Sequence, residues 1–273
     1  MLEKIQQTVS YLQGKLGDFS PEIGIILGTG LGGLADEIET EAIFPYKDIP
    51  NFPVSTVEGH KGNLIFGKLS GRNVVAMQGR FHFYEGYSMK EVTFPVRVLK
   101  FLGIKLLIVS NASGGVNPDF NVGDIMIIRD HINLFPEHPL RGKNDDRLGP
   151  RFPDMSEVYK KEYIDLAFKI AKEHGINLQK GVYIGVQGPT FETPAEYLYM
   201  RAIGGDAVGM STVPEVIVAR HMDLPVFALS VITDSGAPDK LKEVSHEEVQ
   251  KAAQAAEPKM RLIIKEFLKK VGE

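Results

Sequence analysis

The chain of 273 residues contains no cysteine. This absence excludes disulfide bonds, thiolate nucleophiles and metal sites with cysteine ligands. It is compatible with a reducing compartment, and the first residues lack the apolar core of a signal peptide. We therefore expect a cytoplasmic protein.

The sequence also lacks an excess of positive charge and any long apolar run. Its formal net charge is -4, so no basic field attracts nucleic acid or an anionic membrane surface. The longest apolar runs, such as residues 106–109, are far too short to cross a bilayer. We expect neither nucleic acid nor a membrane among its partners.

Motifs of two large groups of hydrolases are missing as well. The chain has no H-E-x-x-H, no sequence cluster of metal ligands and no G-x-S-x-G. These absences disfavour metal-assisted catalysis and serine hydrolysis, and we expect no metal.

What the sequence does contain is a regular alternation of apolar strands and amphipathic helices. With no clear linker, it predicts a single α/β domain over residues 1–273, with helices covering both faces of a sheet. Two segments rich in proline, 41–58 and 131–154, are predicted to be irregular. The predicted strands are residues 23–27, 64–69, 74–78, 105–110, 124–129, 181–187 and 224–233, and the predicted helices are 2–17, 92–102, 156–174, 195–203 and 245–272.

Polar, glycine-rich clusters follow most of the predicted strands. In α/β sheets, ligands gather at the loops beyond the strand ends. We therefore expect the binding site among residues 28–33, 79–87, 111–117, 188–194, 209–212 and 233–236.

The segment from Val208 and Gly209 to Glu215 combines an apolar contact with a helix start. Thr212 and Glu215 have the spacing of a capping box, which leaves the Ser211 hydroxyl outside the cap. Because open N–H groups at a helix start favour an anion, Ser211 beside Met210 predicts an anion next to an apolar group. An ordinary strand-to-helix turn is an equally good interpretation of this segment alone.

The motif Gly28-x-Gly30-x-x-Gly33 matches the dinucleotide fingerprint, but a lone match is weak. The acidic residue at the right distance, Asp48, lies among prolines and ends no strand, which argues against a nicotinamide-dependent oxidoreductase. We expect instead that these glycines let the backbone approach an anion, with Thr29 supplying a hydroxyl.

Two further groups of residues suit the two ends of a charged, aromatic ligand. Arg80 and His82, two apart on an extended segment, with His60, favour phosphate. Phe191 and Glu192 suit a flat heterocycle with an N–H donor. Asp234, beyond a buried strand, is as compatible with a structural role as with a functional one, and spacing alone does not show that any of these residues converge.

Taken together, the motifs resemble those of the trimeric purine nucleoside phosphorylases. The resemblance covers nearly the whole chain, and several blocks recur in fixed order. It implies a single α/β domain around a mixed, twisted sheet, and the transfer of a pentosyl group from a purine nucleoside to inorganic phosphate without a cofactor. The matching blocks are residues 28–32, 59–60, 79–87, 109–116, 129–134, 188–192 and 207–221.

The resemblance also implies a role for each matching residue. It places phosphate against Thr29, His60, Arg80, His82, the Ala112 backbone and Ser211. It places ribose against Tyr84, Met210 and His246, and the base against Phe191, Glu192, Val208, Gly209 and Asp234. His82, Glu192 and Asp234 are the implied catalytic residues.

Three departures from the family pattern concern specificity and assembly. Asp234 stands where the 6-oxopurine enzymes have asparagine, and Ser235 replaces a lysine that is common in those enzymes. An ionised aspartate only accepts hydrogen bonds, so we expect better acceptance of adenosine. The loop after Asn133 is shorter than usual, and Phe135 is the candidate for an aromatic residue lent to a neighbouring site in a homotrimer.

Two other functions remain open at this point. A 5′-methylthioadenosine phosphorylase shares the fold and the aspartate, but should have an apolar residue at His246. A purine-nucleoside-binding module would bind the same ligands and release no base.

Overall fold

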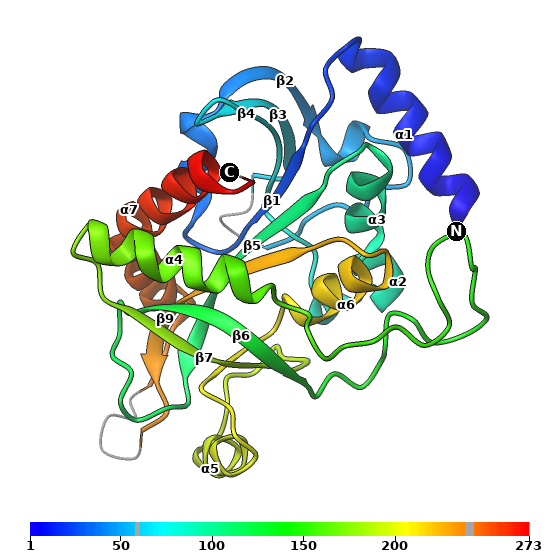
Figure 1. Ribbon diagram of the computed structural model, residues 1–273. Coiled ribbons are helices and arrows are strands. Elements are labelled where there is room, and N and C mark those ends of the chain that lie inside the picture. The colour runs from blue at the N-terminus through cyan, green and yellow to red at the C-terminus, as the bar shows by residue number, and fades with distance from the viewer. Residues whose placement is uncertain (58–60, 238–242, 273) are drawn as a thin grey trace.

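The computed structural model describes residues 1–57, 61–237 and 243–272. Nine strands form one mixed, twisted sheet flanked by helices, which confirms the predicted fold class (Figure 1). The order of the strands is β2-β3-β4-β1-β5-β8-β7-β6-β9. Their bounds are β1 Ile23–Leu27, β2 Glu39–Pro45, β3 Asn63–Leu69, β4 Arg72–Gln78, β5 Leu106–Gly115, β6 Ile125–Asn133, β7 Leu178–Gly185, β8 Ala207–Gly209 and β9 Val226–Ser235.

The sheet closes on itself at one end. Strand β9 pairs with β6 in antiparallel fashion and also with β5 in parallel fashion, so β5, β8, β7, β6 and β9 form a ring. The ring brings the end of β9 beside the end of β5, where Gly114 lies opposite Asp234. Sequence periodicity carries no signal of such closure, because it depends on pairing between distant strands.

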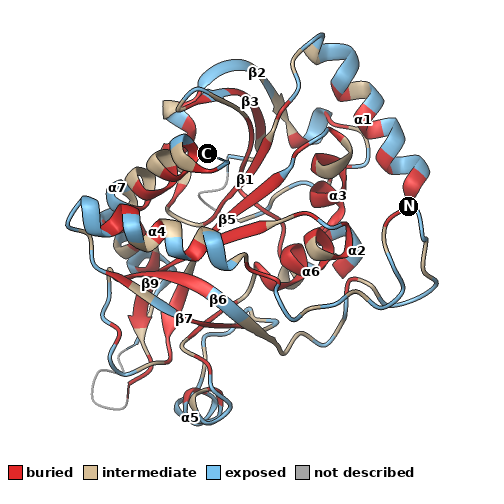
Figure 2. Cartoon of the chain, in the orientation of Figure 1, coloured by how far each residue is buried: buried red, intermediate tan, exposed pale blue. Residues whose placement is uncertain are grey.

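Helices cover the sheet on two sides. In Figure 1, α1, α2, α3 and α6 lie on one side of the strands, and α4 and α7 lie on the other. Figure 2 shows buried residues along β1, β5 and β9 and many exposed residues on α5. The helices are α1 Leu2–Leu16, α2 Met89–Val92, α3 Phe94–Phe101, α4 Lys161–Glu173, α5 Pro194–Ala202, α6 Val213–His221 and α7 His246–Lys270, with short 3₁₀ turns at η1 Gly32–Glu37, η2 Tyr46–Asp48 and η3 Phe83–Glu85.

Two segments predicted to be loops are strands. Residues 39–45 form β2, which pairs with β3 at the edge of the sheet and ends at Pro45, where the missing N–H breaks no central ladder. Residues 111–115 extend β5, because its parallel pairing with β9 continues as far as Gly115. The polar residues of this extension are therefore held rigidly by the sheet.

Two helices, α2 and α3, stand in the region of the single helix predicted at 92–102. Ser88 caps α2 in a capping box with Glu91, and a second helix, α3, begins after Thr93 with Pro95 in its first turn. The helix predicted from Ser156 begins only at Lys161. In the described part of the chain, no helix is both long and apolar enough to cross a membrane.

Candidate active site

One cleft collects nearly all of the predicted site residues, which confirms that they converge. It is bordered by the ends of β4, β5, β8 and β9 and by the start of α7. Its lining consists of Thr29, Arg80, His82, Tyr84, Asn111, Ala112, Ser113, Gly114, Phe191, Glu192, Val208, Gly209, Met210, Ser211, Thr233, Asp234, His246 and Val249. His60 lies outside the described residues, and Phe135 is not part of the lining.

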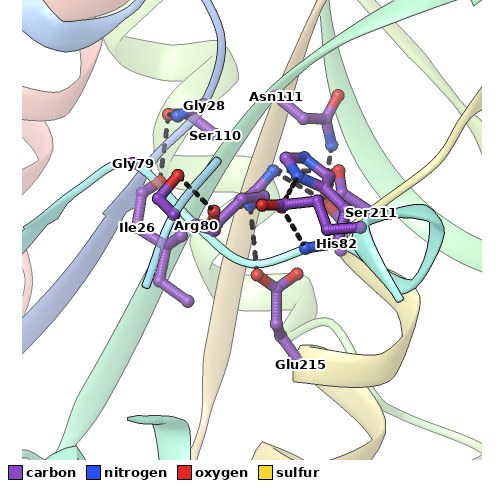
Figure 3. A network of polar contacts seen from close by, with 12 residues as sticks. Ile26, Gly28, Gly79, Arg80, His82, Ser110, Asn111, Ser211 and Glu215 are labelled. Carbon is purple, nitrogen blue, oxygen red and sulfur yellow. Dashed lines mark hydrogen bonds and ion pairs between the residues drawn. The ribbon is translucent and has the colours of Figure 1, made fainter. Parts of the chain in front are cut away.

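Arg80 is the central cation at one end of the cleft, and it is 1% exposed. Its Nε lies 3.1 Å from Oε1 of Glu215, and its Nη1 donates to Oγ of Ser211 over 2.9 Å. Figure 3 shows Arg80 and Ser211 with His82 close beside them. Glu215 thus fixes the guanidinium from behind, and the group is held ready for an anion.

The predicted capping box at Thr212 and Glu215 is wrong. Thr212 has φ 68° and makes no side-chain cap, while Glu215 pairs with Arg80 instead. Val213 N–H donates to Ser211 C=O over 2.7 Å, so these residues form a tight γ-turn. A β-branched residue with positive φ is strained, and such strain persists only where the surroundings enforce it.

A chain of buried hydrogen bonds enforces the γ-turn from β5 and β9. Asn111 Nδ2 donates to Oγ1 of Thr212 over 2.8 Å, and Ser230 Oγ donates to Oδ1 of Asn111 over 2.5 Å. The hydroxyls of Ser230 and Ser113 lie 2.5 Å apart. The position of the Ser211 hydroxyl is therefore set by the sheet rather than by helix α6 alone.

His82 lies beside Arg80 and is held by Glu85. The Nδ1 atom of His82 is 2.8 Å from Oε1 of Glu85. Burial lowers the pKa of His82, and the hydrogen bond with Glu85 only partly opposes this effect. Burial alone would raise the pKa of Glu85, but hydrogen bonds from His82 and Thr56 lower it to about 2. The imidazole is thus neutral at neutral pH, with its Nδ1–H donating to a carboxylate.

The glycines after β1 pack closely against other parts of the chain, and their approach to an anion stays a prediction. A Cβ at Gly28 would lie 2.7 Å from the Ser110 carbonyl oxygen. Gly30 has φ 72° and faces α7, and Gly33 N–H donates to Glu257 of α7 over 2.6 Å. These contacts bring α7 against the cleft and leave Thr29 in its lining.

The other end of the cleft carries two carboxyl groups, Glu192 and Asp234. Burial raises the pKa of Glu192 to about 7, and the nearby charge of Asp234 adds to this effect. Burial also raises the pKa of Asp234, against hydrogen bonds from Tyr197 and Thr233. In the described residues, neither carboxyl lies in an ion pair with a cation.

Tyr84, Met210 and His246 contribute to the same lining. The ring of Tyr84 stacks on His82 with centroids 4.7 Å apart, and Met210 packs against Gly188. His246 is the first residue of α7, which Ser245 caps, and its Nε2 lies 3.0 Å from Gln250 Nε2. Phe191 directly precedes Glu192 in the chain, lines the cleft with it and is 42% exposed.

Two aromatic residues of the long 134–154 loop differ sharply in exposure. Phe135 packs against the core, with its ring centroid 6.4 Å from that of Phe83. Phe152 is 87% exposed and lies beside Arg151. Phe152 is thus the more exposed of the two rings, while the lending of Phe135 to a neighbouring site stays a prediction.

Sequence reasoning missed the residues that hold the cleft residues in place. Glu85 and Glu215 each stand three or four positions from a cleft residue, but the same spacing also fits a local cap. Tyr197 gives no signal in the sequence, because it lies on α5 among exposed residues. Only the tertiary fold brings its hydroxyl to Glu192 and Asp234. Among described residues, no group of acids and histidines is placed to hold a metal ion.

Comparison with known proteins agrees with this geometry. The sequence matches the family described as "Phosphorylase superfamily" over residues 22–269. The chain belongs to this family. It is 55% identical to purine nucleoside phosphorylase 1 of Bacillus subtilis over 254 residues, which are 93% of this chain and 93% of that protein. It is 51% identical to the purine nucleoside phosphorylase of Rattus norvegicus over 269 residues, which are 96% of this chain and 93% of that protein.

Solved structures of this family have the same fold. The purine nucleoside phosphorylase of Schistosoma mansoni in complex with adenosine is 43% identical, with a TM-score of 0.93, and the match covers 100% of this chain and 98% of that one. A schistosome purine nucleoside phosphorylase with hypoxanthine matches with the same TM-score of 0.93 and 43% identity, over 100% of this chain and 98% of that one. The predicted resemblance to the purine nucleoside phosphorylases is thereby confirmed, while the trimer stays a prediction.

Proposed function

We propose that this protein is a purine nucleoside phosphorylase, which converts a purine nucleoside and inorganic phosphate into free base and α-ribose 1-phosphate. The observation that carries the proposal is one cleft with a buried, fixed arginine at one end and two carboxyls beside an exposed phenylalanine at the other. The first end suits phosphate, and the second suits a purine. The function of the family members named above supports the same reading.

At the phosphate end, the residues bind and orient an anion without attacking the sugar themselves. Arg80 and Ser211 hold phosphate oxygens, with Thr29, the Ala112 backbone and His60 as further predicted contacts. His82 is neutral, and its orientation is fixed by Glu85. Phosphate held on one face of the ribose stabilises the positive charge that develops on the sugar and then attacks C1′, which inverts its configuration.

At the other end, the residues stabilise the departing base. The purine leaves with excess negative charge, so hydrogen bonds aimed at it strengthen in the transition state. In this proposal Glu192 contacts the ring N–H of a 6-oxopurine, and Asp234 contacts the substituent at C6. Val208, Gly209 and Phe191 give the base its apolar contacts, and Tyr84, Met210 and His246 contact the ribose.

His246 favours a nucleoside with a 5′-hydroxyl over 5′-methylthioadenosine. Its imidazole stands at the rim of the cleft and offers a polar partner where the methylthio group would need an apolar one. Replacing His246 with leucine should raise the KM for inosine far more than the KM for methylthioadenosine. An equal change for both substrates would favour the methylthioadenosine phosphorylase.

We further propose that phosphate is a co-substrate, that no cofactor or metal takes part, and that the protein works in the cytoplasm as a homotrimer. The absence of cysteine supports a reducing compartment. The trimer rests on the resemblance of the sequence to the trimeric purine nucleoside phosphorylases. Light scattering coupled to gel filtration tests the trimer, and a monomer at assay concentrations would contradict it.

The function is tested by incubating the protein with inosine, adenosine or methylthioadenosine, with and without phosphate. Free base that appears only when phosphate is present is the expected result. Binding of nucleoside without release of base would instead indicate a non-catalytic binding module.

A further inference from the structure

We propose that Tyr197 is a positioning residue through which Glu192 and Asp234 share one proton, so that the same site accepts both 6-oxo and 6-amino purine nucleosides. The inference rests on the proposed function and goes beyond it. It concerns a residue behind the cleft rather than in its lining.

The Tyr197 hydroxyl lies between the two carboxyl groups. It is 3.0 Å from Oδ2 of Asp234 and 3.3 Å from Oε2 of Glu192. The other oxygen of Asp234, Oδ1, accepts from Thr233 over 3.0 Å. Tyr197 itself is 3% exposed, so its hydroxyl has little access to water as an alternative partner.

The surrounding chain is shaped to admit this ring. A Cβ at Gly236 would overlap the Tyr197 ring, and a Cβ at Gly114 would lie 2.9 Å from both the Tyr197 hydroxyl and Oδ2 of Asp234. Any larger residue at either glycine would displace the tyrosine or the aspartate. The hydroxyl is therefore held in place between β5, β9 and α5.

Counting protons shows why the arrangement needs a shared one. A tyrosine hydroxyl has a single proton and can donate it to only one carboxylate at a time. The second carboxyl can approach the same oxygen favourably only if it carries a proton of its own. Two ionised carboxylates about one hydroxyl would repel each other, and in the described residues no cation is paired with either of them.

The charged groups around the pair agree with one retained proton. Glu196 on α5 adds a further negative charge near Glu192. Arg201 directs its Nε to the Val116 carbonyl oxygen, 3.0 Å away, rather than to either carboxyl. His246 stands in the cleft lining, and Glu248 follows it at the start of α7. The pair therefore carries a single negative charge near neutral pH.

The shared proton has two arrangements of equal total charge. In one, Glu192 is the acid and Tyr197 donates to ionised Asp234. In the other, the Glu192 proton has passed to the Tyr197 oxygen while the Tyr197 proton has passed to Asp234. One O–H bond is broken and one is formed at each end, and the hydroxyl always donates to the ionised carboxylate.

The two arrangements match the two classes of purine. A 6-aminopurine has a bare N1 and an amino donor. In its complex, Glu192 donates its proton to N1 instead of to the Tyr197 oxygen, and ionised Asp234 accepts from the amino group and from Tyr197. A 6-oxopurine has an N1–H donor and a carbonyl oxygen, which suit ionised Glu192 and a neutral Asp234 that does not repel the oxygen. The shorter bond to Asp234 indicates that Tyr197 chiefly supports the arrangement for aminopurines.

The test is the ratio of kcat/KM for adenosine to that for inosine in Tyr197→Phe, which keeps the ring and removes the hydroxyl. We expect kcat/KM for adenosine to fall about tenfold and that for inosine to fall no more than about threefold, since a hydrogen bond to a charged group is lost. Tyr199→Phe is the matched control, because Tyr199 is on the same helix and 53% exposed. This control should leave both values unchanged.

A second variant separates positioning from folding. In Asp234→Asn there is no ionised aspartate for Tyr197 to support. Adding Tyr197→Phe to this variant should therefore leave the ratio of kcat/KM for adenosine to that for inosine unchanged. Equal losses for both substrates in Tyr197→Phe, or no loss, would overturn the inference, as would a wild-type protein that cleaves inosine but not adenosine. A wild-type protein that releases no base from either nucleoside would instead overturn the proposed function.

Discussion

The two ends of the cleft treat charge in opposite ways. At the phosphate end, a carboxylate fixes each of the two polar groups: Glu215 holds the Arg80 guanidinium, and Glu85 holds the neutral His82 imidazole. At the base end, Glu192 and Asp234 face each other across a neutral hydroxyl with no paired cation among the described residues. The first end is built for one invariant ligand, and the second can change its protonation with the ligand.

The difference follows from what each ligand requires. Phosphate is the same anion in every turnover, so a rigid set of donors costs nothing in versatility. Purines differ in whether N1 and the C6 substituent donate or accept hydrogen bonds. The two carboxyls can serve either pattern, because burial raises both pKa values, that of Glu192 to about 7, and so favours a proton retained on the pair.

Removing the fixed cation should break the phosphate end most severely. Arg80→Ala is expected to lower kcat/KM for inosine on the order of 1,000-fold, because a preorganised charge is lost at the reacting phosphate. Steady-state kinetics at several phosphate concentrations measures this fall in kcat/KM. Arg147→Ala, at an arginine whose side chain is 70% exposed, is the matched control and should have no effect. A loss below tenfold for Arg80→Ala would contradict a central role for this residue.

At the base end, Asp234→Asn should alter selectivity more than turnover. Asparagine offers an N–H donor and cannot be ionised, so we expect the adenosine-to-inosine ratio of kcat/KM to fall about tenfold. Kinetics with both substrates under the same conditions provides the measurement. An adenosine-to-inosine ratio that is the same in Asp234→Asn and in the wild-type protein would contradict a role of Asp234 in selecting the base.

The same ratio should change little with pH. Adenosine uses protonated Glu192 with ionised Asp234 and inosine uses the reverse, so both complexes hold one proton on the pair. Because the pKa of Glu192 is about 7, kcat/KM is expected to fall for both nucleosides as pH rises from 6 to 8, by about the same factor. Glu192→Gln should flatten this fall. A ratio of kcat/KM for adenosine to that for inosine that changes more than about threefold over this range would argue against the shared proton.

The smallest effect is expected for the exposed ring in the long loop. Phe152→Ala should raise the KM for inosine about threefold if a neighbouring copy places this ring at the cleft, by loss of apolar contact area. Phe135→Ala should instead lower the melting temperature, because Phe135 packs against the core. A change in the KM for inosine in Phe135→Ala and none in Phe152→Ala would support the prediction made from the sequence that Phe135 is lent to a neighbouring site.

The sequence predicts the convergence of the cleft residues better than it predicts their supports. Arg80, Ser211 and Glu192 stand in loops beyond strand ends, where the general rule for α/β sheets places ligands. The capping box predicted from Thr212 and Glu215 is wrong, because the spacing is a local pattern, while the ion pair of Glu215 with Arg80 depends on the tertiary fold. The ring closure of the sheet has the same origin, since it pairs β5 with β9 across more than 100 residues of chain.

The central claim is that phosphate, rather than water, receives the ribosyl group. The most direct measurement is phosphorus NMR of the products formed from inosine and phosphate. The account predicts α-ribose 1-phosphate in an amount equal to the hypoxanthine released. Free ribose in that amount, or release of hypoxanthine at the same rate without phosphate, would contradict it.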